Sequence, residues 1–281
     1  LEEALEIKVA VAREAGDTRT VLEAHKRWAQ LAVERKRPLD GANRLLMLGH
    51  WLTDRGEWDD AQGVYEEARR LFDREKDTLG QARALNNLAN LKLQRGELQQ
   101  AIQTYRRSLR IFEGEEMLSV VDAARTYLNL SLAHKGLGQR DEALRAIEEA
   151  LELAQESKNA GLVAHCFAQR GAVKADIGHW GEAEADYARA ARVFRANHDD
   201  LGLAIVRDQE AILHKANGEY ERAETARLEA LKLLEKLNRP HEMAVTQLNM
   251  ADLYYAMGEY DQAWELANQA WEVLARLKSG M

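Results

Sequence analysis

The sequence contains few of the residues that break helices, build sheets or cross-link a chain. Among 281 residues there are two prolines, four phenylalanines and one cysteine. A single cysteine excludes an intrachain disulfide and fits a reducing compartment. No run of β-branched residues is long enough for a sheet, whereas the helix-favouring residues Ala, Leu, Glu, Arg and Gln are abundant. The composition therefore predicts an all-α, cytoplasmic protein.

Long apolar runs and concentrated positive charge are scarce as well. No apolar segment approaches the roughly 20 residues that span a bilayer, and no signal peptide is visible. The net charge is −8, and the basic residues are scattered among acids, so the sequence lacks the electrostatic footprint of a nucleic-acid-binding protein. We expect neither a nucleic-acid partner nor a membrane association. The chain opens without an initiator Met, which favours a fragment of a longer protein.

Glycines recur at a nearly constant spacing of 40 residues, with one interval of 42. They are Gly16, Gly56, Gly96, Gly138, Gly178, Gly218 and Gly258. Such a period indicates a solenoid. Each glycine can end a first helix in the left-handed conformation before a second helix begins, so we expect seven helix-turn-helix repeats and about 14 helices. The expected repeats are about 2–41, 42–81, 82–123, 124–163, 164–203, 204–243 and 244–281.

Each repeat combines a small residue, the glycine, a large residue two positions later and, in most repeats, an alanine five positions later. This pattern resembles the tetratricopeptide repeat, with a period longer than the usual 34 residues. Repeats of about 40 residues are similar to those of kinesin light chains, spindle-orientation adaptors and bacterial sensor-regulators. The resemblance implies one right-handed superhelical solenoid over residues 1–281. It also implies a protein or peptide partner, held by a scaffold or by the sensing arm of a bacterial signalling regulator.

The first helix of each repeat carries a stripe of residues spaced i, i+4, i+7 and i+11 opposite its packing face. In the tetratricopeptide family this stripe lines the concave groove. An amide recurs at the second position of the stripe, and an amide can pair with any peptide backbone because it both donates and accepts. The alternative is that these amides are plain polar surface. The predicted groove residues are Asn43, His50, Arg83, Asn87, Asn90, Arg125, Asn129, Gln169, Gln209 and Asn249.

The charge of the stripe changes along the chain. Arg83 and Arg125 stand at its first position, where later repeats have Ile205 and Val245. A partner with a carboxylate near the two arginines and an apolar part further along would fit this order. Alternatively, each arginine pairs with a nearby acid of the chain itself.

Catalytic and cofactor signatures are missing. No two histidines have metal-ligand spacing on one helix face. Cys166 follows His165, but consecutive helix residues point about 100° apart, so they do not form a nucleophile–base pair. We expect no enzyme activity, no metal and no cofactor.

Trp264 and Trp271 are seven residues apart and share a face of the last expected helix. Because no further repeat follows in this sequence, we expect a homotypic contact through that helix or a longer native chain. Self-association is therefore the alternative function, with the groove incidental. A second reading has both rings folded onto their own repeat.

The sixth repeat breaks the apolar pattern. Positions that hold Leu85, Leu88 and a tyrosine in the third repeat hold Arg207, Glu210 and Arg227, and Arg170 stands one repeat earlier. We predict a partly buried ion network of the three arginines around Glu210, which Glu210→Ala would destabilise by about 3 kcal/mol or more. The alternative is that the arginine heads reach solvent on their apolar stems.

Overall fold

The computed structural model describes residues 2–114 and 119–279. Over these residues the chain forms fourteen α-helices and no strand. The helices come in pairs, which we call helix A and helix B of each repeat. This arrangement confirms the expected all-α repeat fold.

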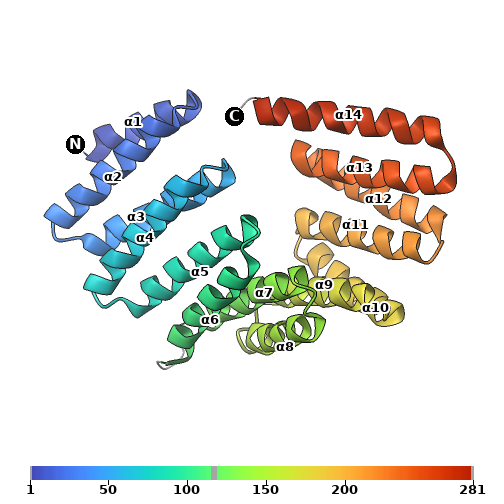
Figure 1. The fold of residues 1–281 in the computed structure, drawn as a ribbon, viewed down its shortest axis with the longest axis horizontal. Coiled ribbons are helices and arrows are strands. Elements are labelled where there is room, and N and C mark those ends of the chain that lie inside the picture. The colour runs from blue at the N-terminus through green and yellow to red at the C-terminus, as the bar shows by residue number, and fades with distance from the viewer. Residues whose placement is uncertain (1, 115–118, 280–281) are drawn as a thin grey trace. The chain divides into compact units, whose positions relative to one another are not determined.

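The structure divides into two compact units, Leu1–Leu153 and Ala154–Met281, and each is described by itself (Figure 1). The first unit contains α1 (Glu2–Glu14), α2 (Thr18–Glu34), α3 (Pro38–Asp54), α4 (Trp58–Arg74), α5 (Thr78–Gln94), α6 (Leu98–Gly114), α7 (Val120–Gly136) and most of α8 (Arg140–Glu156). The second contains α9 (Ala160–Asp176), α10 (Trp180–Ala196), α11 (Asp200–Ala216), α12 (Tyr220–Lys236), α13 (Pro240–Met257) and α14 (Tyr260–Ser279).

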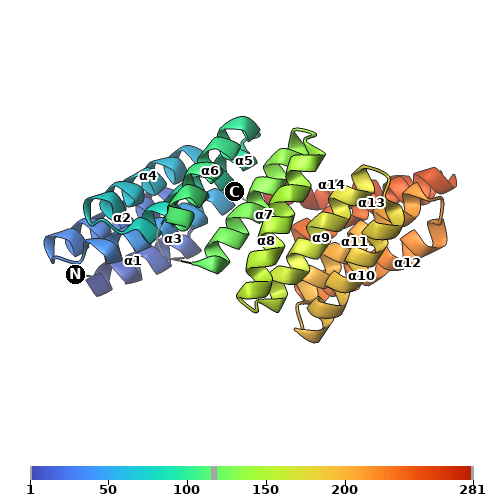
Figure 2. The same ribbon diagram turned by 90° about the horizontal axis from the view of Figure 1, so that it is seen from below.

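Neighbouring helices along the chain pack against each other from α1 to α7 and from α9 to α14 (Figures 1 and 2). Successive A helices also touch, because α3 contacts α5, α5 contacts α7, and α9 contacts α11. The repeats therefore stack within each unit. Each expected repeat boundary falls four residues inside a helix A, since α3 begins at Pro38 and α5 at Thr78. That all seven repeats form one domain stays a prediction.

The seven recurring glycines do end the A helices, as expected. All seven have positive φ, between 70° at Gly16 and 85° at Gly258. At Gly56 the backbone N–H donates to the carbonyl of Thr53 (3.0 Å), and the next N–H, of Glu57, donates to Leu52 (2.9 Å). These two bonds satisfy carbonyls that the helix end leaves unpaired.

In five of the links between a helix B and the next helix A, one further residue has a left-handed backbone conformation, which the glycine pattern did not reveal. These residues are Lys36, Lys76, Lys158, His198 and Asn238. The following A helix begins in one of two ways. A side chain caps it at Asp77, Ser119, Asn159 and Asp199, and proline occupies its first position at Pro38 and Pro240. Both devices suit a helix N-terminus.

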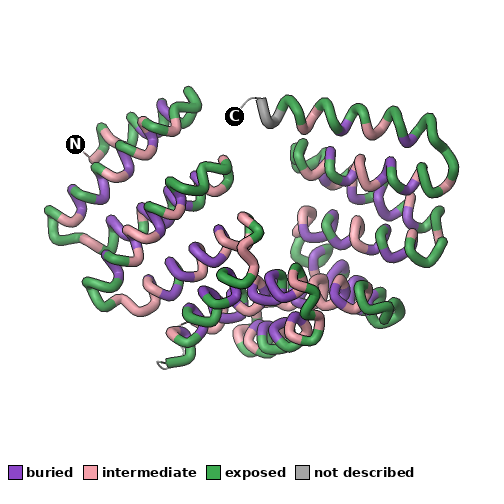
Figure 3. Tube along the Cα trace, viewed as in Figure 1, coloured by how far each residue is buried: buried purple, intermediate pink, exposed green. Residues whose placement is uncertain are grey.

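Each unit has an apolar interior built from alternating buried and exposed helix positions (Figure 3). Helix B contributes a large ring at one recurring position, where Tyr65, Tyr105 and Tyr187 are at most 2% exposed. Helix A approaches this ring closely. A Cβ on Gly49 would lie 2.3 Å from the ring of Tyr65, so only glycine fits there.

Candidate functional site

The stripe that runs along helix A, which we call the A-helix stripe, faces solvent in both units. In α5, Arg83 is exposed and Asn87 and Asn90 are half-buried, whereas Leu85 and Leu88 between them are buried. The helical register predicted from the sequence is therefore correct. The exposure of the A-helix stripe is compatible both with a binding groove and with a plain polar surface, so other features must distinguish these two interpretations.

A pocket of about 200 Å³ in the first unit brings four of the predicted groove residues together. His50 of α3, Arg83 and Asn87 of α5, and Arg125 of α7 all line it. Asn43 is exposed on α3 but does not line this pocket. Three successive A helices therefore contribute stripe residues to one cavity, as expected when repeats stack in register.

The two arginines of this pocket differ in their pairing. Arg83 Nε donates to Asp122 Oδ2 at 2.8 Å, so its charge is partly balanced within the chain. Arg125 is exposed and has no hydrogen bond or ion pair among the described residues. Beside them, the ring of His50 packs edge-on against Tyr65, with centroids 5.8 Å apart. Arg125 is therefore the cation best placed to receive a carboxylate from outside.

Asn86 is a pocket residue that the stripe pattern missed. Its Oδ1 atom is buried and has no hydrogen-bond partner among the described residues, and the residue lines the same pocket as Asn87. A buried acceptor without a donor is costly, so it needs a partner. The signal in the sequence is the crowding of Asn86, Asn87 and Asn90 in a helix, where asparagine is a poor helix former.

The side chain of Asn90 is hydrogen-bonded within the fold. Its Oδ1 accepts a hydrogen bond from the hydroxyl of Tyr105 at 2.6 Å and another from Nδ2 of Asn129 at 2.9 Å. Burial raises the pKa of Tyr105, which keeps the hydroxyl protonated as a donor. These bonds join α5, α6 and α7, so the predicted amide ladder is partly used to hold the repeats together.

The second unit presents a different stripe. Gln169 and Gln209 are half-buried on α9 and α11, while Asn249 of α13 donates from Nδ2 to Asp208 Oδ2 at 3.0 Å. Apolar residues stand at the first and third positions in α11 and at the first position in α13, and they are exposed. Ile205 is 50% exposed, Ile212 44% and Val245 40%. The expected apolar section of the stripe therefore exists on α11 and α13.

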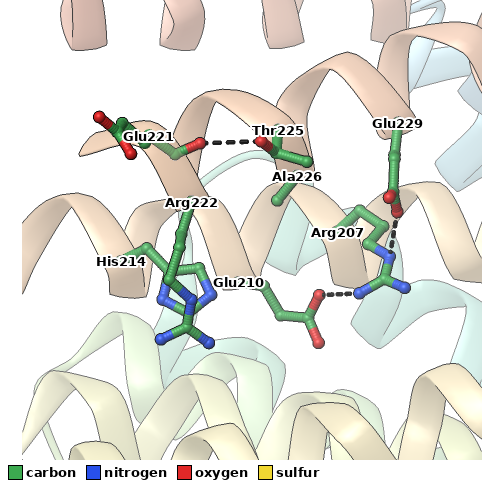
Figure 4. A pocket seen from close by; sticks show the side chains of 8 residues that line it. All are labelled: Arg207, Glu210, His214, Glu221, Arg222, Thr225, Ala226 and Glu229. Carbon is green, nitrogen blue, oxygen red and sulfur yellow. Dashed lines mark hydrogen bonds and ion pairs between the residues drawn. The ribbon is translucent and has the colours of Figure 1, made fainter. Parts of the chain in front are cut away.

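The predicted ion pair of repeat six is present (Figure 4). Arg207 Nη1 lies 2.5 Å from Glu210 Oε2, and its Nε lies 2.9 Å from Glu229 Oε2. Arg207, Glu210 and Glu229 all line a pocket of about 340 Å³. His214 lines it as well, and its Nδ1 lies 2.9 Å from Glu219 Oε2. Because the arginines and the histidine in this pocket have acidic neighbours within the chain, we interpret it as structural.

The other two arginines have carboxylates that the prediction did not include. Arg170 binds Asp186 through two hydrogen bonds of 2.7 and 2.8 Å. Arg227, only 2% exposed, lies 3.5 Å from Asp208 and donates to the backbone carbonyl of Asn249. Three arginines around one glutamate leave an excess of positive charge, and Asp186 and Asp208 are the further acids that balance it. The sequence register shows helix faces but not which acid on a neighbouring helix reaches an arginine.

The pKa values of buried Asp186 and half-buried Asp208 are shifted in opposite directions. Burial pushes the pKa of Asp186 up, but hydrogen bonds from Arg170 and Lys174 outweigh it, so that pKa lies below its ordinary value. Burial also raises the pKa of Asp208, and Arg227 only partly offsets this. Asp186 is therefore the better-compensated carboxylate.

The side chains that could take part in catalysis or metal binding are not arranged as a catalytic site. Burial raises the pKa of the Cys166 thiol to about 12, so almost no thiolate exists at neutral pH. The exposed His165 packs edge-on against Phe194, with ring centroids 4.9 Å apart. Among the described residues, no group of three or more His, Cys, Asp or Glu side chains could hold a metal.

Within the described ranges, every helix is too short or too polar to cross a bilayer.

Trp264 and Trp271 of α14 are 72% and 70% exposed. The reading in which both rings fold onto their own repeat is therefore wrong. Trp264 lines a pocket of about 600 Å³ together with Tyr255 and Tyr260. Whether a second copy of the chain covers these rings stays a prediction.

Family models described as Tetratricopeptide repeat match residues 42–114 and 124–157. A model of anaphase-promoting complex subunit 5 matches residues 2–35 and 168–217. No curated protein is found to match the sequence.

Solved structures share the fold. The apo form of RapI superposes with a TM-score of 0.76 at 14% identity, covering 99% of each chain. A Rap protein complexed with Competence and Sporulation Factor gives 0.73 at 12% identity, over 97% of this chain and 74% of the other. BtubC (BKLC) from P. vanneervenii gives 0.62 at 21% identity, over 76% of this chain and 88% of the other. At such identities the likeness establishes the fold alone.

Proposed function

This chain belongs to the tetratricopeptide repeat family, and we propose that it is a non-enzymatic scaffold that binds an extended segment of a protein partner. The segment lies along the A-helix stripe, and the pocket of the first unit receives a carboxylate of that segment. Its stacked repeats offer one A helix after another to an extended chain. A Rap protein of the same fold has been solved in complex with Competence and Sporulation Factor, so an array of this kind can hold a partner.

The observation that carries the proposal is the pocket shared by α3, α5 and α7. It gathers His50, Arg83, Asn87 and Arg125, and it combines a cation without a partner among the described residues with the buried Oδ1 of Asn86, which lacks a donor. A peptide fits this pocket, because its carboxylate can bind Arg125 and its backbone N–H can bind the half-buried amide of Asn87.

The second unit, taken by itself, offers a different surface. Its exposed Ile205 and Val245 would suit an apolar section of a partner. We infer that the array is the sensing arm of a bacterial signalling regulator in the cytoplasm, in line with its resemblance to sensor-regulator repeats. The single, buried Cys166 fits a reducing compartment.

The test is a pull-down from a bacterial lysate with the intact array, followed by mass spectrometry. The same pull-down is run with Arg125→Ala and with Arg106→Ala, whose arginine is exposed on α6 of the same unit outside the pocket. We expect a partner that Arg125→Ala loses and Arg106→Ala retains. Cross-links from that partner should fall on α3, α5 and α7. A partner whose capture is indifferent to Arg125, and whose cross-links avoid these helices, would contradict the proposed groove.

A further inference from the structure

One carboxylate of the chain itself lies inside the pocket that α3, α5 and α7 share. Asp122 lines this pocket together with Arg83 and Arg125. Its Oδ2 accepts a hydrogen bond from Arg83 Nε at 2.8 Å, so the pair joins α7 to α5. The side chain of Asp122 is 21% exposed, against 48% for Arg83. The acid is therefore the less solvated member of the pair, and salt screens its charge less than that of a surface acid.

Asp122 pairs with an arginine of the neighbouring repeat and not with the arginine of its own helix. Arg125 follows Asp122 by three residues on α7, a spacing that places two side chains on the same side of a helix. The ion pair nevertheless joins Asp122 to Arg83, and Arg125 has no ion pair among the described residues. The backbone of Asp122 is fixed as well, because its N–H donates to Ser119 Oγ at 3.2 Å and its carbonyl accepts from Thr126 Oγ1 at 2.8 Å.

The charged side chains among the described lining residues leave one positive charge without a partner. Arg83 and Asp122 balance each other, and Arg125 remains. A carboxylate carries one negative charge and neutralises that remainder. A phosphate monoester carries about −1.5 to −2 at neutral pH, so its second charge would find no cation of its own and would lie close to Asp122. Like charges at short distance repel, and a partly buried pocket screens them weakly.

We propose that Asp122 limits the pocket of the first unit to a single negative charge, so that the array selects a carboxylate there and rejects a phosphate monoester. This inference rests on the proposed function and names the charge of the group that the pocket takes. Asp122 determines the specificity by neutralising Arg83, while Arg125 receives the ligand. The carboxylate comes from the C-terminus of the partner or from an aspartate or glutamate side chain, since both sources carry the same charge.

The alternative is that the pair of Arg83 and Asp122 only ties α5 to α7. Asp59 of α4 forms a pair of this kind outside the pocket, where it lies 2.7 Å from Arg95 Nη2. Removal of a mere tie would alter stability alone. Removal of a limit on charge would alter the preference between a carboxylate and a phosphate, so the ratio of two affinities separates the two roles.

The probes are four acetylated pentapeptides with alanines around one variable central residue. Three of them end in an amide and carry glutamate, phosphoserine or glutamine at the centre. The fourth carries the central glutamine and a free C-terminal carboxylate. Binding of millimolar peptide to the 281-residue chain is followed at neutral pH and low salt by the NMR signals of isotope-labelled arginine side chains, and the variant Arg125→Ala identifies the signal of Arg125.

The variant Asp122→Asn keeps the shape of the side chain and removes its charge. Asp59→Asn removes the same charge outside the pocket and is the matched control. We expect the glutamate peptide to bind the unmodified chain more tightly than the phosphoserine peptide. In Asp122→Asn the ratio of the two affinities should shift toward phosphoserine by at least about tenfold, because the second charge no longer meets an acid. Asp59→Asn should keep the ratio of the unmodified chain.

A second variant tests the same charge count in the other direction. Arg83→Gln leaves Asp122 without its partner, so the ratio should shift further toward the glutamate peptide. This shift is measurable even where Asp122→Asn does not fold.

A phosphoserine peptide that binds the unmodified chain as tightly as the glutamate peptide overturns the inference, and so does a ratio that both Asp122→Asn and Arg83→Gln leave unchanged. The glutamate peptide and the peptide with the free C-terminus distinguish the two sources of the carboxylate, and tighter binding of either one agrees with a single charge. If no charged peptide shifts the Arg125 signal more than the neutral glutamine peptide does, the carboxylate pocket of the proposed function fails together with this inference.

Discussion

At equivalent positions of the same fold, the second and fourth repeats have apolar or aromatic residues, whereas the fifth and sixth repeats have charged residues. Leu48 and Leu130 on helix A correspond to Arg170 and Glu210, and Tyr65 on helix B corresponds to Arg227. All of them are buried except Arg170, which is half-buried. A helical hairpin can therefore be closed by apolar side chains or by charges that find partners on neighbouring helices. The charged version is the more specific one, because each charge requires its own partner.

Removing Asp186 should produce the largest loss. Asp186 is 1% exposed and binds both Arg170 and Lys174. We expect Asp186→Ala to lower the free energy of unfolding by about 3 to 5 kcal/mol, because it leaves cations without their carboxylate. Urea denaturation measures the loss. Thr104→Ala, at the equivalent position of repeat three, should cost about 1 kcal/mol. Equal losses in the two variants would remove the distinction between the repeats.

Acid should weaken the second unit through the same residue. Because the folded-state pKa of Asp186 lies below its ordinary value, its contribution is fully present above that ordinary value, near 4, and is lost as pH falls through the lower folded pKa. Unfolding free energy measured between neutral pH and about pH 2 should therefore fall less steeply in Asp186→Asn. If the unfolding free energies of the unmodified chain and of Asp186→Asn fell in parallel with pH, the folded-state pKa of Asp186 would not lie below its ordinary value.

Importing the residues of repeat four tests whether the charges are needed for stability. Repeat four carries Leu130 and Ala146 where repeat five has Arg170 and Asp186. We expect Arg170→Leu/Asp186→Ala to be neutral, or to stabilise by about 1 to 4 kcal/mol, since an apolar pair avoids the desolvation of two charges. The thermal midpoint is the readout, with Asp186→Ala as the reference. A double variant as unstable as that single variant would show that the rest of repeat five requires the ion pair.

Glu210→Ala should cost less than the sequence predicts. Arg207 is 22% exposed and keeps Glu229 as a partner, so the expected loss is about 1.5 to 3 kcal/mol instead of 3 or more. Hydrogen exchange should show the earliest opening at the amides of α11. Exchange that accelerates evenly over α9 to α14 would argue that Glu210 does not hold this joint in particular.

The smallest effect concerns the stripe of the first unit. Asn87→Ala should raise the free energy of unfolding by a few tenths of a kcal/mol, because alanine is the better helix former and Asn87 makes no hydrogen bond among the described residues. Asn129→Ala should instead lose about 1 kcal/mol, since Asn129 donates to Asn90. Once the partner is known, Asn87→Ala should weaken its binding. A drop in the thermal midpoint with Asn87→Ala would assign this amide to the fold.

Much of the candidate site could be read from periodicity alone. The spacing of Arg83, Asn87 and Arg125 places them on the solvent face of their helices, and the pocket gathers them as the stacking of repeats requires. Periodicity could not show that Asn90 is engaged by Tyr105 and Asn129. Such a bond depends on the distance between two helices, which no pattern within one helix contains.

The sequence by itself determined the fold class, the seven repeats and the glycine turns, because helix propensity and a left-handed helix end are local properties of the chain. Only the tertiary structure decided which carboxylate balances each buried arginine, which asparagines remain available to a ligand, and that Trp264 and Trp271 are open to solvent. These outcomes depend on contacts between side chains that are far apart in the sequence and lie on different helices. A change of about 1 Å in the distance between donor and acceptor decides whether a hydrogen bond forms.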